Sequence, residues 1–352
     1  MGSTRSLFRR IAIGAGAALG VALVALAGFV ASRQSRRFDA PLPTIVASTD
    51  PAVVERGRYL VTGPAHCVEC HGASDDDGHR LHDAEHETVL SGGHAWDLPI
   101  GRFRAPNLTA DREYGIGGMT DGQIARALRY GVGRDGGALL PFMPFADLGD
   151  DDLRAIVSYL RTQRPVHRSV PSQEWNVLGR VMRAFVGAPQ GPSQQVRTSV
   201  PANTTASYGE YLTHSVANCF GCHTQRNLRT GEWTGRAFAG GMPFESDHTP
   251  GRTFVSANLT PDPSTGRIAA WSEDAFVARF RAGLQFADSP MPWTAFGRMT
   301  DDDLRAIYRY LRSVPAVHND VPQSQQLSVD SRQSQTRGDA RLASASRFIP
   351  SS

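Results

Sequence analysis

The sequence contains one five-residue motif twice, as CVECH at 67–71 and as CFGCH at 219–223. These two motifs hold all four cysteines of the 352-residue chain. Four cysteines in an exported protein can form two disulfides, but here no cysteine is left over for a separate disulfide framework. The motifs therefore call for an explanation in which both thiols and the histidine act together.

The sequence around the motifs repeats as well, at an offset near 150 residues. GRYLVTGPAHCVECH pairs with GEYLTHSVANCFGCH, APNLTADREYGIGGMTDGQI with SANLTPDPSTGRIAAWSEDAF, and DDDLRAIVSYLRTQRPV with DDDLRAIYRYLRSVPAV. Each copy spans roughly 110–125 residues, which is a normal size for one domain with its own core. The pattern predicts a tandem duplication.

Within each copy the sequence predicts short helices joined by long loops. Asp50 followed by Pro51 is typical of a helix start, and Thr300 precedes three aspartates that suit the positive end of a helix dipole. Apolar residues then recur at helical spacing, at Leu304, Ile307, Tyr308 and Leu311. No sustained alternation typical of strands appears. We expect an all-α fold of two tandem domains.

The remaining stretches complete the predicted domain organisation. Residues 166–204 join the two copies and include a short amphipathic helix, whereas the polar tail is expected to be disordered. The predicted divisions are an N-terminal membrane anchor or signal at 1–37, a first domain at 38–165, the linker at 166–204, a second domain at 205–318 and the tail at 319–352.

The N-terminal segment is long enough to cross a membrane. Residues 11–31 are 21 apolar or small residues, which gives about 30 Å of helix. The apolar region of a cleaved signal peptide is usually shorter, about 7–15 residues, so we expect an anchor. A signal cleaved after Ala25-Leu26-Ala27 and a buried core helix stay open as alternatives.

The charge distribution indicates which side of the membrane the rest of the chain occupies. Three arginines precede the apolar segment, which favours an exported body, and three more follow it and weaken that bias. Residues 1–37 carry six arginines and no acidic residue, and the rest of the chain carries 31 basic against 34 acidic side chains. This mildly acidic body offers no basic stripe for nucleic acid.

The spacing of Cys-x-x-Cys-His suits the covalent attachment of haem. Cysteines at i and i+3 project to the same side of a helical turn and match two vinyl groups on one porphyrin edge, and the histidine can then ligate the iron. A zinc site would need four ligands, and a thioredoxin-like motif expects a βαβ context. The sequence predicts two haem c groups per chain, bound by Cys67, Cys70, Cys219 and Cys222, with His71 and His223 as axial ligands of the iron.

A methionine is the expected second axial ligand in each copy. Met143 and Met291 both stand in a Met-Pro-aromatic loop just before the last helix, where proline stiffens the loop. Met242, in a second Met-Pro-Phe triplet, and its counterpart His94 are alternatives. A five-coordinate iron in one copy also stays open.

The first copy carries an additional His-rich insertion between its motif and its glycine pair. His79, His82 and His86 lie in the stretch SDDDGHRLHDAEHE. They could bind a surface metal ion, although a charged insertion of this kind is more often a solvated loop.

The chain resembles the multi-haem cytochrome c subunits of bacterial membrane-bound alcohol, aldehyde and gluconate dehydrogenases. The resemblance covers roughly 50–318 and rests on GxYL before each motif, CHTQRN at 222–227, NLTPD at 258–262, the Met-Pro-aromatic loops and the DDDLRAIxxYLR helices. Those subunits typically have three haem motifs and a C-terminal membrane attachment, whereas this chain has two motifs and an N-terminal apolar segment. The resemblance implies haems that pass electrons from a dehydrogenase subunit toward ubiquinone or another acceptor.

Together these features predict an electron-transfer protein rather than an enzyme in its own right. We expect two cytochrome c domains on the periplasmic side of a bacterial inner membrane, held there by one helix. The expected partners are a dehydrogenase subunit and a quinone, terminal-oxidase or cytochrome acceptor. A peroxidase-like enzyme with one haem open to a small ligand, and a structural or sensor module, are the alternatives.

The first prediction concerns the number of cofactors. We expect two covalently bound haems per chain, one on each motif, because each motif has both thiols and the histidine. Haem staining of a denaturing gel tests covalent attachment, and a reduced-minus-oxidised spectrum gives the number per chain. Fewer than two haems per chain would contradict the assignment.

Overall fold

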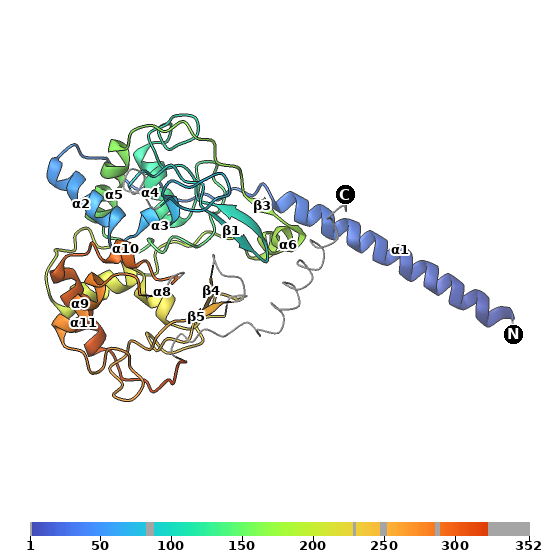
Figure 1. Ribbon diagram of the computed structural model, residues 1–352. Coiled ribbons are helices and arrows are strands. Elements are labelled where there is room, and N and C mark those ends of the chain that lie inside the picture. The colour runs from blue at the N-terminus through green and yellow to red at the C-terminus, as the bar shows by residue number, and fades with distance from the viewer. Residues whose placement is uncertain (1, 82–87, 228–229, 247–251, 286–288, 323–352) are drawn as a thin grey trace, which may run out of the picture. The chain divides into compact units, whose positions relative to one another are not determined.

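The computed structural model describes residues 2–81, 88–227, 230–246, 252–285 and 289–322 (Figure 1). It divides into two compact units, Met1–Thr62 with His66–Val200 and Gly63–Ala65 with Pro201–Ser352. Most of the predicted polar tail, from residue 323 onward, lies outside the described residues.

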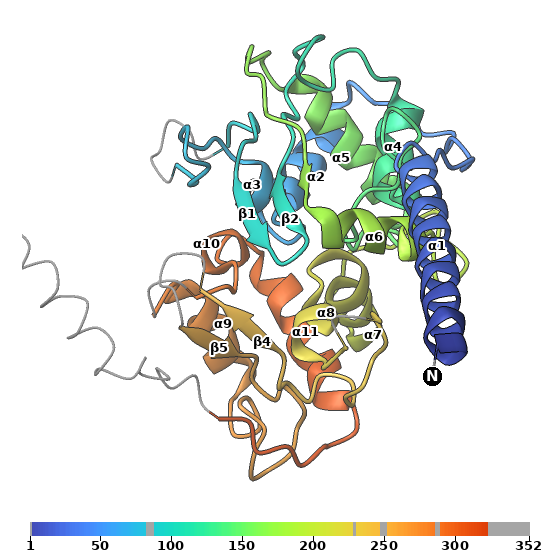
Figure 2. The ribbon, with the colours of Figure 1, turned by 90° about the vertical axis from the view of Figure 1, so that its right-hand side faces the viewer.

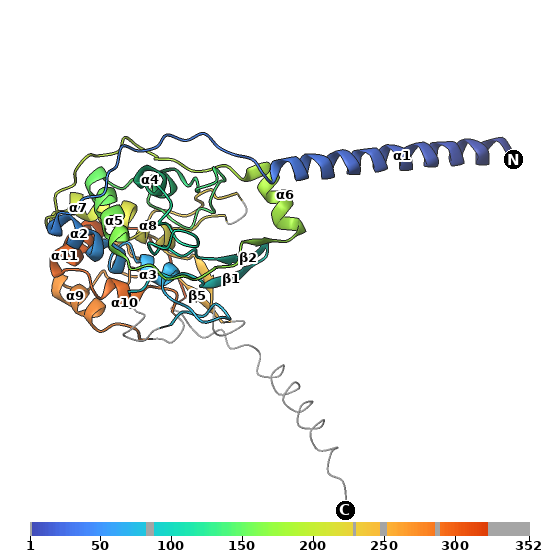
Figure 3. The ribbon, with the colours of Figure 1, turned by 90° about the horizontal axis from the view of Figure 1, so that it is seen from above.

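The N-terminal helix α1 runs from Gly2 to Arg33 and appears as one continuous helix in Figure 3. Its stretch Phe8–Arg33 is long and apolar enough to cross a membrane, and none of its most apolar window is buried. The alternative of a buried core helix is therefore wrong. The membrane anchor and the cleaved signal both stay open, because an exposed apolar helix near the N-terminus fits either one.

The first unit contains helices and a small sheet after α1. Its elements are α2 (Pro51–Thr62), α3 (Cys67–His71), β1 (Ala95–Leu98), β2 (Gly101–Arg104), α4 (Asp121–Tyr130), α5 (Asp150–Thr162), β3 (Glu174–Trp175) and α6 (Val177–Val186). The second unit contains α7 (Ala206–Tyr211), the π-helix η1 (Leu212–Val216), α8 (Cys219–His223), β4 (Pro243–Glu245), β5 (Thr253–Val255), α9 (Glu273–Arg281), α10 (Trp293–Phe296) and α11 (Asp301–Ser313).

The predicted helix starts are confirmed. Asp50 caps α2, because its carboxylate accepts a hydrogen bond from the backbone N–H of Ala52 at 2.8 Å. The hydroxyl of Thr300 caps α11 by accepting a bond from the N–H of Asp303. Each cap satisfies a backbone donor that a helix leaves unpaired in its first turn.

In each unit two helices cross at a glycine, α2 with α5 in the first and α7 with α11 in the second. A Cβ atom on Gly57 of α2 would lie 1.9 Å from the carbonyl oxygen of Ala155 in α5. A Cβ atom on Gly209 of α7 would lie 1.9 Å from the carbonyl oxygen of Ala306 in α11. The helix backbones therefore approach too closely for any side chain, and this explains the glycine two residues before Tyr-Leu in both copies.

The all-α prediction is incomplete, because the described residues also form five short strands. β1, β2 and β3 form an antiparallel sheet, and β4 pairs antiparallel with β5 (Figure 2). No strand exceeds four residues, which is too short for an alternating pattern to emerge from a sequence. β3 lies within the predicted linker 166–204, and the ring of Trp175 packs edge-on at 4.7 Å from that of Phe103.

The second prediction tests the helix crossing. Gly57→Ala should lower the free energy of unfolding of the first unit by about 1–3 kcal/mol, because the added methyl group overpacks the crossing. Helix propensity alone would favour alanine by up to about 1 kcal/mol, so the sign of the change is informative. Guanidinium unfolding followed by circular dichroism measures it.

Gly122→Ala in α4 is the matched control. That site also lies in a helix, but a Cβ atom there would be 3.2 Å from the carbonyl oxygen of Pro43 and 3.5 Å from the side chain of Leu42, a tight contact rather than a clash. We expect a change near zero or a slight gain in stability. Equal effects at Gly57 and Gly122 would contradict the close crossing.

Candidate functional site

Each Cys-x-x-Cys-His motif forms a five-residue helix that begins at a left-handed residue. His66 precedes α3 with φ of 40°, and Asn218 precedes α8 with φ of 53°. Histidine and asparagine are among the residues that tolerate this conformation. The sharp turn starts the helix directly at Cys67 or Cys219, which places the two thiols and the imidazole on neighbouring positions of one turn.

The histidine of each motif is oriented by a backbone carbonyl group. The Nδ1 atom of His71 lies 2.9 Å from the carbonyl oxygen of Pro106, and the Nδ1 atom of His223 lies 2.8 Å from that of Ala257. A carbonyl oxygen only accepts hydrogen bonds, so Nδ1 carries the proton and donates it. The lone pair of each neutral ring is then on Nε2, where a metal ion binds.

Burial keeps both imidazoles neutral. Removal from solvent lowers the pKa of His71 and of His223 below the usual histidine value, and the bond to the carbonyl group only partly opposes this shift. Only a neutral imidazole can ligate iron. The lowered pKa of both histidines thus agrees with the iron ligation expected from the motif.

The cysteines lie in surroundings that disfavour the thiolate form. Burial raises the pKa of Cys67 and of Cys219 to about 12, and the neighbouring thiol of each motif adds to the shift. None of the four cysteines forms a disulfide in the structure. Two cysteine thiols beside a neutral imidazole fit covalent haem attachment, because each thiol can add across a vinyl group of the porphyrin to give an uncharged thioether.

In the first unit, Asn107 holds the segment that carries the Pro106 carbonyl group. Its side-chain amide donates to the carbonyl oxygen of Val166 at 2.8 Å, and its Oδ1 atom accepts bonds from the backbone and hydroxyl of Thr109. Asn107 is buried, so its bonds are shielded from water. The residue that follows Pro106 is therefore tied to the segment after α5.

The second unit repeats these bonds. Asn258 donates to the carbonyl oxygen of Val317 at 2.9 Å and accepts from the backbone and hydroxyl of Thr260. It directly follows Ala257, whose carbonyl group orients His223. The Asn-Leu-Thr triplet of both copies thus holds the segment that orients the histidine. The sequence showed this triplet only as part of the repeat.

A glycine pair closes the other side of each motif. The N–H of Gly92 donates to the carbonyl oxygen of His71, and the N–H of Gly240 donates to that of His223. Both glycines have positive φ, and a Cβ atom on either would lie 2.5 Å from the backbone that orients the histidine. Sequence reasoning aligned these glycines but missed why they are required.

The structure places the expected methionine ligands in loops before the last helices. Met143 lies between α4 and α5, and Met291 lies just before α10; both are half-buried. Of the alternatives, Met242 is buried, and the ring of His94 contacts both the carbonyl oxygen of Gly78 and the ring of Trp96. Ligation by Met143 and Met291 stays a prediction.

The second motif lies among aromatic side chains. Phe220 stands inside the second motif, stacks on His214 of η1 at 4.7 Å and meets the exposed Trp233 at 4.7 Å. The Nε2 atom of His214 lies 3.0 Å from the hydroxyl of Tyr310. The position of Phe220 is taken by Val68 in the first motif.

Other candidate sites find less support. Among the described residues, no three His, Cys, Asp or Glu side chains gather as a metal ion would require. His82 and His86 lie outside the described residues, whereas His79 is 3.5 Å from a carboxylate oxygen of Asp75. The interpretation of the insertion as a metal site therefore stays a prediction.

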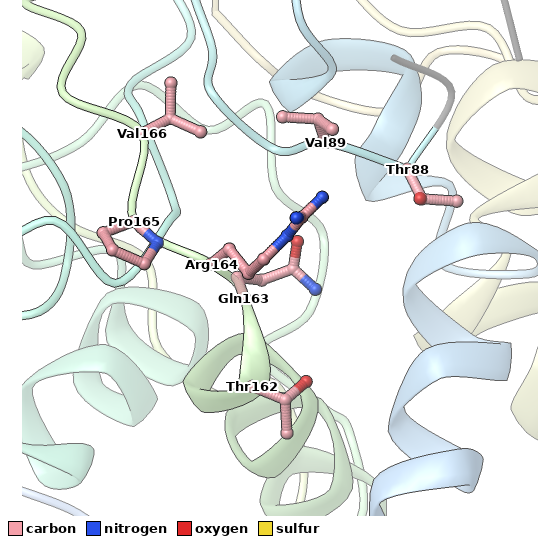
Figure 4. A pocket seen from close by; sticks show the side chains of 7 residues that line it. All are labelled: Thr88, Val89, Thr162, Gln163, Arg164, Pro165 and Val166. Atoms are coloured by element: carbon pink, nitrogen blue, oxygen red, sulfur yellow. The ribbon is translucent and has the colours of Figure 1, made fainter. Parts of the chain in front are cut away.

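A cavity of about 360 Å³ lies in the first unit. Figure 4 shows its lining, which consists of Thr88, Val89, Thr162, Gln163, Arg164, Pro165 and Val166. It includes no cysteine, histidine or methionine. It is therefore separate from the predicted cofactor site.

Comparisons with known proteins agree with the chemistry of the site. A family model described as cytochrome c matches residues 54–164. The cytochrome c subunit of the quinone-dependent alcohol dehydrogenase of Gluconobacter oxydans is 30% identical over 81% of this chain and 58% of its own length. The fructose dehydrogenase cytochrome subunit of Gluconobacter japonicus is 30% identical over 78% of this chain and 55% of its own length.

A third relative matches almost from end to end. A dihaem c-type cytochrome of Cereibacter sphaeroides is 30% identical over 85% of this chain and 97% of its own length. The chain thus spans less than three fifths of the two dehydrogenase subunits but nearly all of the dihaem relative.

The third prediction tests the brace behind His71. Asn107→Ala should lower the free energy of unfolding of the first unit by about 2–4 kcal/mol, because it removes several hydrogen bonds and leaves buried partners unsatisfied. The unfolding midpoint in guanidinium measures the change.

Asn203→Ala is the matched control. Asn203 makes the same local bonds to the backbone and hydroxyl of a threonine two residues on, but it is exposed. Water replaces those bonds when they are lost, so we expect less than about 1 kcal/mol. A loss at Asn107 no larger than at Asn203 would show that the brace contributes little.

Proposed function

The chain belongs to the family of c-type cytochromes, and from this premise we propose that it is a membrane-anchored dihaem electron-transfer protein. The observation that carries the proposal is the duplicated site. In each unit two cysteines lie one helical turn apart, beside a neutral, buried or half-buried histidine whose Nδ1 atom is fixed by a carbonyl group. Haem c, when bound there, supplies one-electron redox chemistry.

The residues of the chain have distinct roles in this proposal. Cys67 and Cys70 would hold one haem covalently, and Cys219 and Cys222 the other. His71 and His223 would ligate the iron through Nε2, and Met143 and Met291 would complete the coordination. The Nδ1 bonds would fix the imidazole planes and raise their basicity, which tunes the reduction potential.

The rigid support behind each histidine favours electron transfer over ligand chemistry. Asn107 and Asn258 tie the orienting carbonyl segment of their unit to the segment after α5 or α11. A site that moves little between oxidation states is suited to passing single electrons. Both units also carry the same Met-Pro-aromatic loop, which disfavours a peroxidase-like site with one open iron.

The partners are proposed from the relatives. The names of several relatives make them cytochrome subunits of alcohol and fructose dehydrogenases. By analogy, this chain would accept electrons from a dehydrogenase subunit and pass them to a quinone or to an oxidase or cytochrome acceptor. It would act as the cytochrome subunit and not as the catalytic one, with its haem units facing the periplasm and α1 in the membrane.

The fourth prediction tests this function on the full-length, haem-loaded protein. Film voltammetry should show two reversible one-electron waves and no catalytic current when hydrogen peroxide is added, because Met143 and Met291 would occupy the position that peroxide needs on each iron. A catalytic peroxide current would overturn the proposal in favour of the peroxidase-like alternative.

Single methionine variants test the axial ligands in the same measurement. Met143→Ala and Met291→Ala should each lower the potential of a different wave by on the order of 0.1 V, since axial ligands set haem potentials over about 0.8 V. Met119→Ala, a half-buried methionine outside both Met-Pro-aromatic loops, is the control and should leave both waves in place. A wave unmoved by its variant would show that its iron has another ligand.

A further inference from the structure

Helix α6 of the first unit exposes a continuous apolar face. Val177, Leu178, Phe185 and Val186 are between 53% and 79% exposed. Their spacing puts them along one side of the helix, together with the half-buried Val181 and Met182. The helix contains two arginines and no acidic residue. A basic helix with an aliphatic and aromatic face is typical of helices that lie in a membrane surface.

The opposite face of α6 is fixed to the sheet of the first unit. Asn176 caps the helix and also bonds to the carbonyl groups of Pro99 and Ile100 in the β1–β2 turn. A Cβ atom on Gly179 would lie 2.1 Å from the carbonyl oxygen of Ile100, so the backbones are in direct contact. The helix cannot rotate its apolar face inward without breaking these bonds.

The exposed face meets the membrane helix near the end of its apolar stretch. The rings of Phe29 in α1 and Phe185 in α6 are 5.3 Å apart, and the side-chain amide of Gln34 donates to the carbonyl oxygen of Arg180 at 3.0 Å. Phe29 precedes Arg33, the last residue of the apolar stretch, by about 6 Å of helix rise. Interfacial helices bury their apolar face about 5–10 Å deep, so Phe185 lies at the matching level.

We propose that α6 is an interfacial helix whose apolar face lies in the headgroup–acyl boundary of the bilayer that α1 crosses. This inference rests on the anchoring of α1 in the proposed function. The occupant is lipid because the face continues directly from the lipid-facing helix. Arginines 33, 36 and 37, just beyond the apolar stretch, suit the level of anionic headgroups. With α1 and α6 both held by lipid, the first unit cannot turn freely about the axis of α1.

Photo-crosslinking in bacterial membranes tests the proposal on the full-length, haem-loaded protein. A benzophenone amino acid replaces Leu178 or Val186 one at a time, since both side chains are exposed and an added cysteine would compete with the haem motifs. After irradiation, mass spectrometry identifies the adduct. We expect phospholipid adducts at both positions, with yields similar to that of the same label in place of Val21 in the middle of α1.

Val46 provides the matched control, because it is also an exposed valine of the first unit, at 69%, but lies outside α6. Its lipid adduct should be several-fold weaker. Protein adducts, or no adduct, at 178 and 186 alongside lipid adducts at 21 would overturn the interfacial helix and leave the anchor intact. Absence of lipid adducts at 21 would overturn the membrane anchoring itself, and with it this inference.

Discussion

The hydrogen bond from the Nδ1 atom of a motif histidine to a backbone carbonyl group is the contact around which each unit is organised. It sets the tautomer of His71 and His223 and so decides which ring nitrogen is available to a metal. The segment that carries this carbonyl group is held in place in turn. In both units a buried asparagine next to the carbonyl group donates a hydrogen bond to the segment that follows α5 or α11. The glycine pair packs against the same backbone from the other side. A loop that looks irregular is therefore one of the most constrained parts of the molecule.

The two units share this framework but differ around it. The second motif is surrounded by the rings of Phe220, His214 and Tyr310, and η1 interrupts the helix that leads to it. The first motif has Val68 in place of Phe220, and its unit carries α1 and α6. The polarity and burial of the side chains around a haem change its reduction potential without changing its iron ligands. With haem bound in both units, as proposed, these different surroundings would give the two sites different reduction potentials.

Much of this organisation was predictable from the sequence, because it depends on which side chains are present and on their spacing. The Cys-x-x-Cys-His motifs, the repeat and the caps at Asp50 and Thr300 depend on side chains, and the comparisons confirm the family. The orienting carbonyl groups of Pro106 and Ala257 were not predictable, since every residue has one and only the fold selects it. The strands were not predictable, because strands of two to four residues are too short to show an alternating pattern. The contact of α6 with α1 joins segments about 150 residues apart, which no local pattern reports.

The glycine crossings also determine when each unit can fold. Gly57 and Ala155, like Gly209 and Ala306, are separated by about 100 residues, so their contact closes a long loop and carries the corresponding entropy cost. The contact cannot form until α5 or α11 has been synthesised. The cysteine motif lies near the beginning of the same loop, so it is synthesised before the loop can close. The architecture thus leaves an interval in which the complete motif is present before the helix crossing forms.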